Sequence, residues 1–388
     1  MGAEYQAETN LRNIVNVQER FTNEGLFYRA FFEAYSSDIS TCDSLIVMPQ
    51  GFCVEPGRIN PYDSLNTLNH NQYTGRAPAD ITNRINEVMK GHKVRVNSKR
   101  ERDHKVGVIV LYQPGVCMDK YLGLYSNGSS NLPNTERMVE KAILEIAKGR
   151  PVTYVGHSLT SFSGMKLASR TYRQELIDEV SETGIMTGGV DQIMPGVIIA
   201  PVTSTKDGLT YNENSGPLAG QPMRVGGIER SLTWMQAFEF AAKVPTWVSK
   251  PLGIYPLRYE SLQGYKGEDT GNQNWAGGAL MRAQSARLAS AADGLALAQE
   301  VAESEQDQTP LGIVTLGDCL FSPGLQSRIF DVIGARTVEV HTGHRWGTEW
   351  VNEQDSAEVR ERKQAAGSEV IVDLIVEQHR ENLERLLA

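Results

Sequence analysis

Six short runs of apolar residues, many of them β-branched, recur along this chain of 388 residues, and each has Gly or Pro at or close to its end. Segments with helical spacing follow several of these runs. Nearly continuous apolar character is typical of strands that are covered on both faces. The alternation therefore predicts an α/β fold with a mostly parallel central sheet and helices on both faces. The predicted strands are Ser44–Pro49, Val106–Tyr112, Val152–Val155, Gly196–Pro201, Leu311–Leu316 and Thr337–His341.

Three segments between the predicted strands have apolar residues at helical spacing, and each predicts a helix. They are Ile81–Lys90, Thr135–Lys148 and Leu159–Leu176. Asn134 or Thr135 is the expected N-cap of the second helix. The tail from Asp355 to Ala388 predicts a final amphipathic helix or pair of helices, because one apolar stripe runs along it. The stripe consists of Val370, Ile371, Leu374, Ile375 and Val376.

The segment from Thr203 to Gln308 interrupts this pattern, because it is rich in Gly, Met and aromatic residues before an alanine-rich stretch at Ala279–Ala302. We interpret it as a helical cap, residues 205–308, inserted into a core that residues 1–204 and 309–388 form. Most of its aromatic rings are expected to build the cap's own core. Trp234 is expected to contact a substrate, since apolar side chains at a domain boundary commonly line a pocket.

The formal net charge of -9 and the isoelectric point near 5.4 argue against nucleic acid or an anionic membrane surface as the main partner. Met1 to Arg20 lack the apolar segment of a signal peptide, and no apolar run reaches the roughly 18 residues of a membrane span. The cysteines show no C-x-x-C spacing, which gives no indication of a metal site or a disulfide framework. We expect a cytoplasmic protein with a small-molecule substrate and neither cofactor nor metal, and a homodimer is left open.

The strongest local signal for chemistry is Val152–Gly164, a predicted strand that runs into a tight turn and then a helix. The turn holds Ser158 between small or compact neighbours, the arrangement of a nucleophile elbow. Such a turn presents the serine hydroxyl to a substrate, and the backbone N–H of the following residue, Leu159, is the expected donor to a developing oxyanion. Taken alone, the pattern is equally consistent with an ordinary Gly- and Ser-containing turn.

Two distant segments supply the other groups that an activated serine requires. Asp318 follows the predicted strand Leu311–Leu316, and His344 follows the predicted strand Thr337–His341. A serine hydroxyl is a poor nucleophile until a base removes its proton, and the base works best when an acid orients it. The chain order serine, acid, histidine is the order that this architecture requires. We therefore predict Ser158 as nucleophile, His344 as base and Asp318 as acid.

Other histidines offer alternatives to this assignment. His341 is a competing base, but it ends a predicted strand and is expected to point into the packing of the sheet. His157 is expected to pack beside the elbow. Four more are expected on the surface: His70, His92, His104 and His379. Trp346 follows the predicted base closely enough to touch a substrate, although a simply packed indole explains it equally well.

These segments resemble the α/β-hydrolase superfamily, over Ser44 to about Ser204 and Leu311 to about Trp350, without a specific family being identified. The sequence GHSLT is similar to the superfamily's G-H-S-x-G elbow, GDCLFSP to its acid turn and HTGHRWG to its histidine loop. The resemblance implies that the loop after Ser44–Pro49 forms the second side of the oxyanion hole. Phe52 would then give the second backbone N–H, and Gln50 and Gly51 would contact the substrate.

The main departure from the pattern is Thr160, where glycine is expected. We expect this β-branched residue either to open the elbow slightly or to contact a substrate. The sequence thus predicts a serine hydrolase that cleaves an ester or thioester of a small to medium, partly apolar substrate through an acyl-enzyme. Two alternatives stay open: an acyltransferase that passes the acyl group to an alcohol or amine, and a ligand-binding protein with an idle triad.

Overall fold

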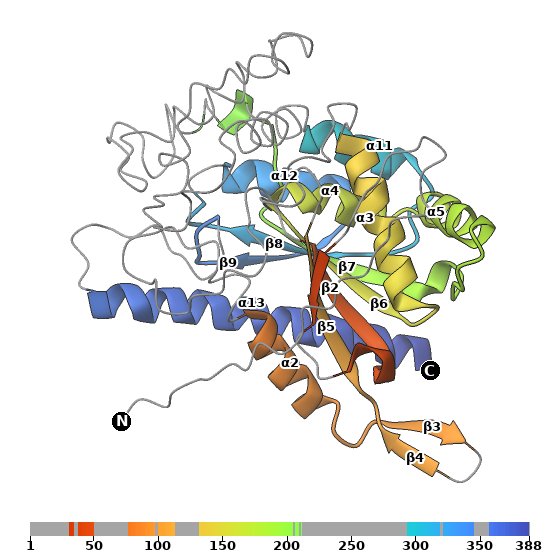
Figure 1. Cartoon of the computed structure of the whole chain (residues 1–388). Coiled ribbons are helices and arrows are strands. Elements are labelled where there is room, and N and C mark those ends of the chain that lie inside the picture. Colours follow the sequence, from red (N-terminus) through yellow and green to blue (C-terminus); the bar gives the residue numbers. More distant parts are fainter. Residues whose placement is uncertain are drawn as a thin grey trace, which may run out of the picture.

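The central layer of the molecule is a twisted sheet, shown in the computed structural model of Figure 1. The structure describes residues 31–34, 38–49, 77–97, 100–112, 132–204, 206–208, 211, 293–318, 321–344 and 357–387. Within these ranges, seven strands pair in the order β1-β5-β2-β6-β7-β8-β9. They are β1 (Phe31–Ala34), β5 (Val106–Tyr112), β2 (Ser44–Pro49), β6 (Val152–His157), β7 (Ile193–Ile199), β8 (Leu311–Thr315) and β9 (Arg336–Val340). Strand β1 runs antiparallel to β5 and the other neighbouring pairs are parallel, which confirms the predicted sheet.

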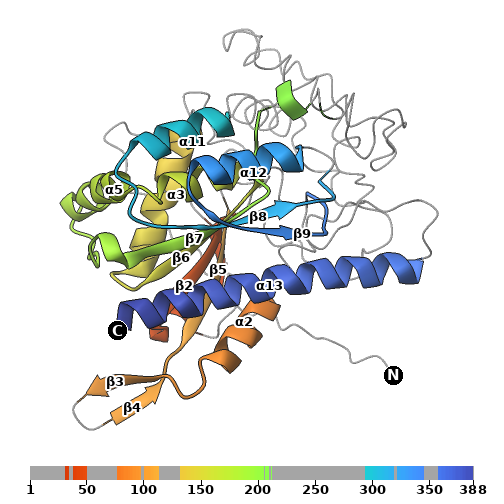
Figure 2. The same cartoon turned by 180° about the vertical axis from the view of Figure 1, so that it is seen from behind.

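Helices cover both faces of the sheet, as Figures 1 and 2 show from opposite sides. One face carries α2 (Ala77–Val88) and the long α13 (Ala357–Leu387), which pack on each other. The other face carries α3 (Leu132–Ala147), α4 (Ser161–Lys166), α5 (Arg170–Glu182), α11 (Gly294–Glu303) and α12 (Pro323–Val332). The fold class predicted from the sequence is therefore confirmed.

Alternating side chains along each strand divide the core between the two faces. In β2, Ile46 and Met48 pack with Ile81 of α2 and Ile375 of α13. Their neighbours Leu45 and Val47 point to the opposite face, into the cluster that contains Ile143 of α3. Successive residues of a strand point to opposite faces, so a strand that is apolar at every position is buried from both sides. Strand β2 is buried along its whole length, as the apolar run predicted.

Several helix boundaries differ from the sequence prediction. The predicted helix Leu159–Leu176 is broken into a short 3-10 turn η2 (Ser158–Thr160), α4 and α5, because Ser169 accepts a hydrogen bond from the N–H of Tyr172 and starts α5 afresh. Helix α3 begins at Leu132 rather than after a cap at Asn134 or Thr135, so that prediction was wrong. The tail forms one continuous helix.

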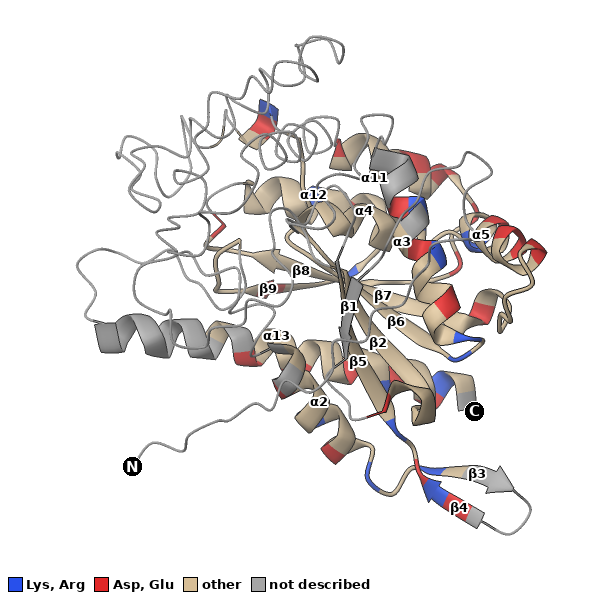
Figure 3. Ribbon diagram, viewed as in Figure 1, with Lys and Arg blue, Asp and Glu red and all other residues tan. Residues whose placement is uncertain are grey.

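The sequence analysis did not anticipate a two-stranded hairpin between α2 and β5. Strands β3 (Lys93–Asn97) and β4 (Arg100–Asp103) pair antiparallel outside the main sheet. In Figure 3 this hairpin projects from the end of the molecule nearest to β5 and α2. Arg102 ties its base to the core through two hydrogen bonds from its guanidinium to the carboxylate of Asp43.

Most of the predicted cap, 205–308, lies outside the described residues. The described part at its C-terminal end contains α11, in which Leu297 and Val301 join the same apolar cluster as Phe162 of α4 and Phe330 of α12. The extent of an inserted domain therefore stays a prediction. None of the helices in the described ranges is long and apolar enough to cross a membrane.

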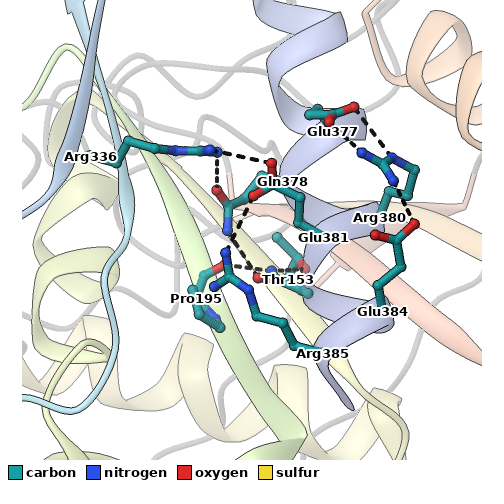
Figure 4. A network of polar contacts seen from close by, with 10 residues as sticks. Thr153, Pro195, Arg336, Glu377, Gln378, Arg380, Glu381, Glu384 and Arg385 are labelled. Carbon is teal, nitrogen blue, oxygen red and sulfur yellow. Dashed lines mark hydrogen bonds and ion pairs between the residues drawn. The ribbon is translucent and has the colours of Figure 1, made fainter. Parts of the chain in front are cut away.

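Polar contacts fasten α13 to the sheet, and Figure 4 shows a group of them. Asn382 donates to the carbonyl of Pro195 at 2.8 Å, and Gln378 accepts from Arg336 of β9 at 2.9 Å. The side chains of Gln378 and Asn382 are 2% and 3% exposed. Buried polar groups need such partners, because an unpaired one costs about 1–3 kcal/mol. These bonds fix where the last helix lies on the sheet.

Two histidines expected on the surface, His104 and His379, are instead buried, so that expectation was wrong. Their Nε2 atoms lie 2.9 and 3.0 Å from the hydroxyl of Ser44, and Nδ1 of His379 lies 2.8 Å from that of Thr153. The hydroxyl of Ser44 can donate to one ring only, so the other ring must donate to it. The polar pattern of α13 gave no sign of this, because the partners come from β2 and β6.

Burial, together with a smaller effect of neighbouring His104, lowers the pKa of His379 from its ordinary value to about 3. The folded protein thus holds this imidazole neutral, whereas the unfolded chain protonates it at an ordinary pKa near 6.5. The unfolded state then binds more protons between pH 6.5 and 3. Stability from this group is complete above pH 6.5 and is lost as the pH falls.

We predict that the free energy of unfolding falls by up to about 1.4 kcal/mol per pH unit below pH 6.5 through this group. His379→Gln, which cannot be protonated, should show a shallower fall, measured by urea denaturation between pH 4.5 and 7.5. The exposed His341→Gln is the matched control and should follow the wild type. Parallel curves for wild type and His379→Gln would contradict the assignment.

Candidate active site

A tight turn joins the central strand β6 to helix α4 and carries Ser158 at its tip. The backbone of Ser158 has φ 55°, in the left-handed region that residues with a side chain rarely adopt. The strand before it is fully buried, and η2 and α4 follow directly. Ser158 itself is partly exposed, whereas Leu159 and Thr160 are buried. The predicted strand, turn and helix are therefore present, with the serine on the accessible side.

Gly156 and Thr160 allow the turn to close. A Cβ on Gly156 would lie 2.7 Å from the carbonyl oxygen of Thr160 and 3.0 Å from the Cα of Ser161, so only glycine fits there without a backbone shift. The hydroxyl of Thr160 accepts from the N–H of His157 at 2.7 Å and donates to its carbonyl at 3.0 Å. The side chain of Thr160 thus stabilises the turn through its hydrogen bonds to the main chain of His157. Its predicted contact with a substrate stays a prediction.

The side chains of Ser158, His344 and Asp318 form one hydrogen-bonded chain. The Nε2 atom of His344 lies 2.9 Å from the Oγ of Ser158, and its Nδ1 lies 2.7 Å from the Oδ2 of Asp318. An ionised carboxylate can only accept a hydrogen bond, so Nδ1 carries a proton. In the neutral imidazole Nε2 is then free to accept the proton of the serine hydroxyl. The structure therefore brings together the three groups that the sequence analysis selected.

His341 takes no part in this chain of hydrogen bonds. It was expected to point into the packing of the sheet, yet it is exposed, and that expectation was wrong. Strand β9 ends at Val340. The chain continues past His341 to Thr342, whose carbonyl accepts from the N–H of Gly317 at 2.9 Å. This bond joins the loop that precedes His344 to the turn that precedes Asp318.

The carboxylate of Asp318 is fully buried and is held by donors from three directions. Its Oδ1 accepts from the N–H of Phe321 at 3.0 Å. Its Oδ2 accepts from the hydroxyl of Thr315 at 3.1 Å and from the Nε2 of Gln326 at 2.8 Å, besides His344. Hydrogen bonds to the charged form offset the cost of burying it. The sequence analysis missed Thr315 and Gln326, because apolar pattern and chain order do not show which buried polar side chains face Asp318.

Two rings and one hydrogen bond restrain His344 from other sides. The rings of His157 and Phe321 lie with their centroids 5.2 and 5.4 Å from that of His344. The Nε2 of His157 lies 2.5 Å from the main-chain carbonyl of His344. A carbonyl only accepts, so His157 carries its proton on Nε2. His157, the residue before Ser158, thus holds the main chain of His344.

The helix that follows the turn is anchored by buried charge. Lys166, at the end of α4, donates to the carboxylate of Glu136 in α3. Burial raises the pKa of Glu136 to about 7, against the opposing effect of Lys166. Burial also raises the pKa of the nearby Glu140, whose carboxylate accepts from the hydroxyl of Tyr172 at 2.7 Å. The first contact fixes the end of α4 against α3, and the second joins α3 to α5.

Of the six remaining predicted site residues, the structure describes one, Leu159. Leu159 is the second residue of η2, in the first turn of a helix, where main-chain N–H groups lack partners within the helix. Five residues lie outside the described ranges: Gln50, Gly51, Phe52, Trp234 and Trp346. In the part of the chain that the structure describes, no group of His, Cys, Asp and Glu could hold a metal ion.

Comparisons with known proteins yield structural neighbours but no sequence relatives. No protein-family model and no curated protein matches the sequence significantly. Est1E from Butyrivibrio proteoclasticus has 10% identity and a TM-score of 0.41, with 92% of this chain and 96% of that chain covered. A thioesterase domain from the curacin biosynthetic pathway has 10% identity and a TM-score of 0.44, with coverage of 95% and 100%. An enol-lactonase from Burkholderia xenovorans has 9% identity and a TM-score of 0.40, with coverage of 89% and 95%.

The chain's own topology defines its architecture. The mostly parallel sheet has helices on both faces. A strand–turn–helix element places Ser158 directly after the central strand β6, and Asp318 and His344 follow the later strands β8 and β9. This is the α/β-hydrolase fold.

Because backbone atoms of Thr160 and Ser161 lie close to Gly156, its replacement by alanine should destabilise the protein. In Gly156→Ala the added methyl group meets backbone atoms rather than a movable side chain, so we expect a loss of about 1–3 kcal/mol in the free energy of unfolding. Thermal and urea denaturation measure the loss. Gly324→Ala in α12 is the control, because its Cβ would meet only the hydroxyl of Ser322 at 3.7 Å. Equal stability of the two variants would show that the turn is not as tight as described.

Proposed function

We propose that this protein is a serine hydrolase that cleaves an ester or thioester through an acyl-enzyme on Ser158. The observation that carries the proposal is the unbroken chain of hydrogen bonds from the Oγ of Ser158 through His344 to the buried Asp318. An activated serine needs a base within reach and an acid that orients the base. The partly exposed Ser158 is the member of this chain that a substrate would meet.

The first half of the reaction forms the acyl-enzyme. As the Oγ of Ser158 attacks the carbonyl carbon, its proton passes to the Nε2 of His344, and Asp318 stabilises the imidazolium. The N–H of Leu159 donates to the oxyanion, and Phe52 supplies the second N–H. Loss of one such donor typically costs about 3–4 kcal/mol of barrier. His344 then gives its proton to the leaving alcohol or thiol as the bond to the carbonyl carbon breaks.

The second half releases the acid product by the same groups. The Nε2 of His344 takes a proton from water, which attacks the acyl carbonyl, and the proton then returns to the Oγ of Ser158 as the ester bond breaks. The substrate is proposed to be small to medium and partly apolar. Trp234 and Trp346 would supply apolar contacts, with Gln50 and Gly51 beside the carbonyl, under the proposed cap 205–308.

Two substitutions test the proposal. We predict that Ser158→Ala and His344→Ala each lower the hydrolysis of p-nitrophenyl esters at least about 10³-fold, because each removes one member of the unit that activates the nucleophile. The esters should vary in acyl length, so that the same assay locates the preferred chain. Circular dichroism checks that both variants remain folded.

His341→Ala is the matched control and should retain wild-type activity, because that imidazole is exposed and outside the hydrogen-bonded chain. A fluorophosphonate probe should label Ser158 in the wild type, with the adduct located by peptide mass spectrometry. An unlabelled Ser158, or an active His344→Ala beside an inactive His341→Ala, would contradict the assignment.

A further inference from the structure

Gln326 lies on the buried side of α12, and both polar atoms of its amide form hydrogen bonds around Asp318. The residue is fully buried. Its Nε2 donates to the Oδ2 of Asp318 at 2.8 Å and to the carbonyl of Phe321 at 3.2 Å. Its Oε1 accepts from the N–H of Thr315 at 3.1 Å, and the hydroxyl of Thr315, whose single proton goes to Asp318, lies 3.3 Å from it. One side chain therefore joins the end of β8, the acid turn and α12.

The partners of Gln326 fix which way its amide points. The N–H of Thr315 can only donate, so it requires the oxygen of the amide. A carboxylate and a main-chain carbonyl can only accept, so they require the nitrogen. A flipped amide would set oxygen against Asp318 and nitrogen against a backbone N–H. The orientation is thus determined by the chemistry of the neighbours, and the amide always offers a proton to Asp318.

This donor acts on the same oxygen that His344 uses. The Oδ2 of Asp318 accepts from Gln326 and also from the Nδ1 of His344 at 2.7 Å. A carboxylate held in this way keeps one rotamer. Because it can only accept, it also keeps the proton of the imidazole on Nδ1 and leaves Nε2 directed at Ser158.

We propose that Gln326 is a positioning residue that fixes the carboxylate of Asp318 and thereby sets both the tautomer and the basicity of His344. The inference rests on the function proposed above and adds a residue to it. Gln326 does not touch the Oγ of Ser158; it acts through Asp318. Thr315 shares the task, since its hydroxyl also donates to Oδ2 at 3.1 Å.

Removal of the donor of Gln326 should make Asp318 and His344 together hold a proton more strongly. Without Gln326 the carboxylate of Asp318 has fewer hydrogen bonds to its charged form, so it holds a proton more strongly. It then either binds the imidazolium of His344 more tightly or becomes protonated itself. Both effects raise the pH that is needed before His344 can accept the serine proton.

The test measures the second-order rate constant for labelling of Ser158 by a fluorophosphonate between pH 5 and 9. For Gln326→Leu we expect the plateau to fall about 10- to 100-fold, as for loss of a hydrogen bond to a charged group. We expect the acidic limb of the profile to move to higher pH by about one unit. Gln326→Met keeps a similar volume, has no donor for Asp318 and adds no charge, so its plateau and its limb should move as those of Gln326→Leu do.

Gln378→Leu is the matched control. Gln378 is a buried glutamine in α13 with two side-chain hydrogen bonds, to Arg336 and Asn382, and none in the site. It should lose comparable stability and keep the wild-type pH profile. A merely structural role for Gln326 would give the same result as this control, since a general loss of stability does not move the acidic limb.

The outcomes separate this inference from the proposed function. If Ser158 of the wild type is not labelled, the proposed function fails. If the wild type is labelled but both Gln326 variants keep its acidic limb, the positioning role is overturned and the hydrolase proposal stands. Should Gln326→Leu fail to fold, Gln326→Met decides alone: a limb at the wild-type pH overturns the role, and a limb at higher pH supports it.

Discussion

The left-handed backbone of Ser158 is the constraint on which the arrangement of the site depends. Such a conformation costs about 1–3 kcal/mol for a residue with a side chain, and it persists only where the surroundings hold it. Here the surroundings are the absent side chain at Gly156, the hydroxyl of Thr160 on the main chain of His157, and the phenol of Tyr154, which donates to the carbonyl of Thr160 at 2.9 Å. The strain is thus offset by contacts within six residues, on a strand that is buried on both faces. The turn then directs the hydroxyl of Ser158 at His344.

The order of the strands places the ends of β8 and β9 far from Ser158, and the loops that follow these strands close that distance. Neighbouring strands are about 4.8 Å apart, so β8 lies about 10 Å and β9 about 14 Å from β6. Asp318 and His344 therefore cannot reach Ser158 from the strand ends directly. The turn after β8 and the loop after β9 return toward β6 together, joined by the bond from the N–H of Gly317 to the carbonyl of Thr342. The contact of His157 with the carbonyl of His344 fastens that return to β6 itself. The hydrogen bond between Ser158 and His344 is local, but its geometry depends on residues that follow three different strands.

The sequence predicts the parts of this structure that depend on apolar pattern and chain order. Runs such as Ser44–Pro49 and Val106–Tyr112 match β2 and β5 at both ends, because a strand buried on both faces needs an apolar residue at every position. The short edge strand β1 and the hairpin of β3 and β4 carry no such pattern and were not anticipated. Chain order likewise selected Ser158, Asp318 and His344, since turns after parallel strands gather at one edge of the sheet. A sequence does not show which buried polar side chains face each other. His379, far along the chain from Ser44, and Gln326 beside Asp318 follow only from the coordinates.

The proposed function requires that the oxygen of Ser158 bonds to an electrophilic carbon while its neighbours hold the proton and the developing charge. A crystal structure of the protein after reaction with a phosphonate ester tests this most directly, because the phosphonate mimics the tetrahedral intermediate. We expect a phosphorus bonded to the Oγ of Ser158, a phosphoryl oxygen within hydrogen-bond distance of the N–H of Leu159, and Nε2 of His344 beside the new bond. Phosphorus on a different residue, or a phosphoryl oxygen directed away from Leu159, would contradict it.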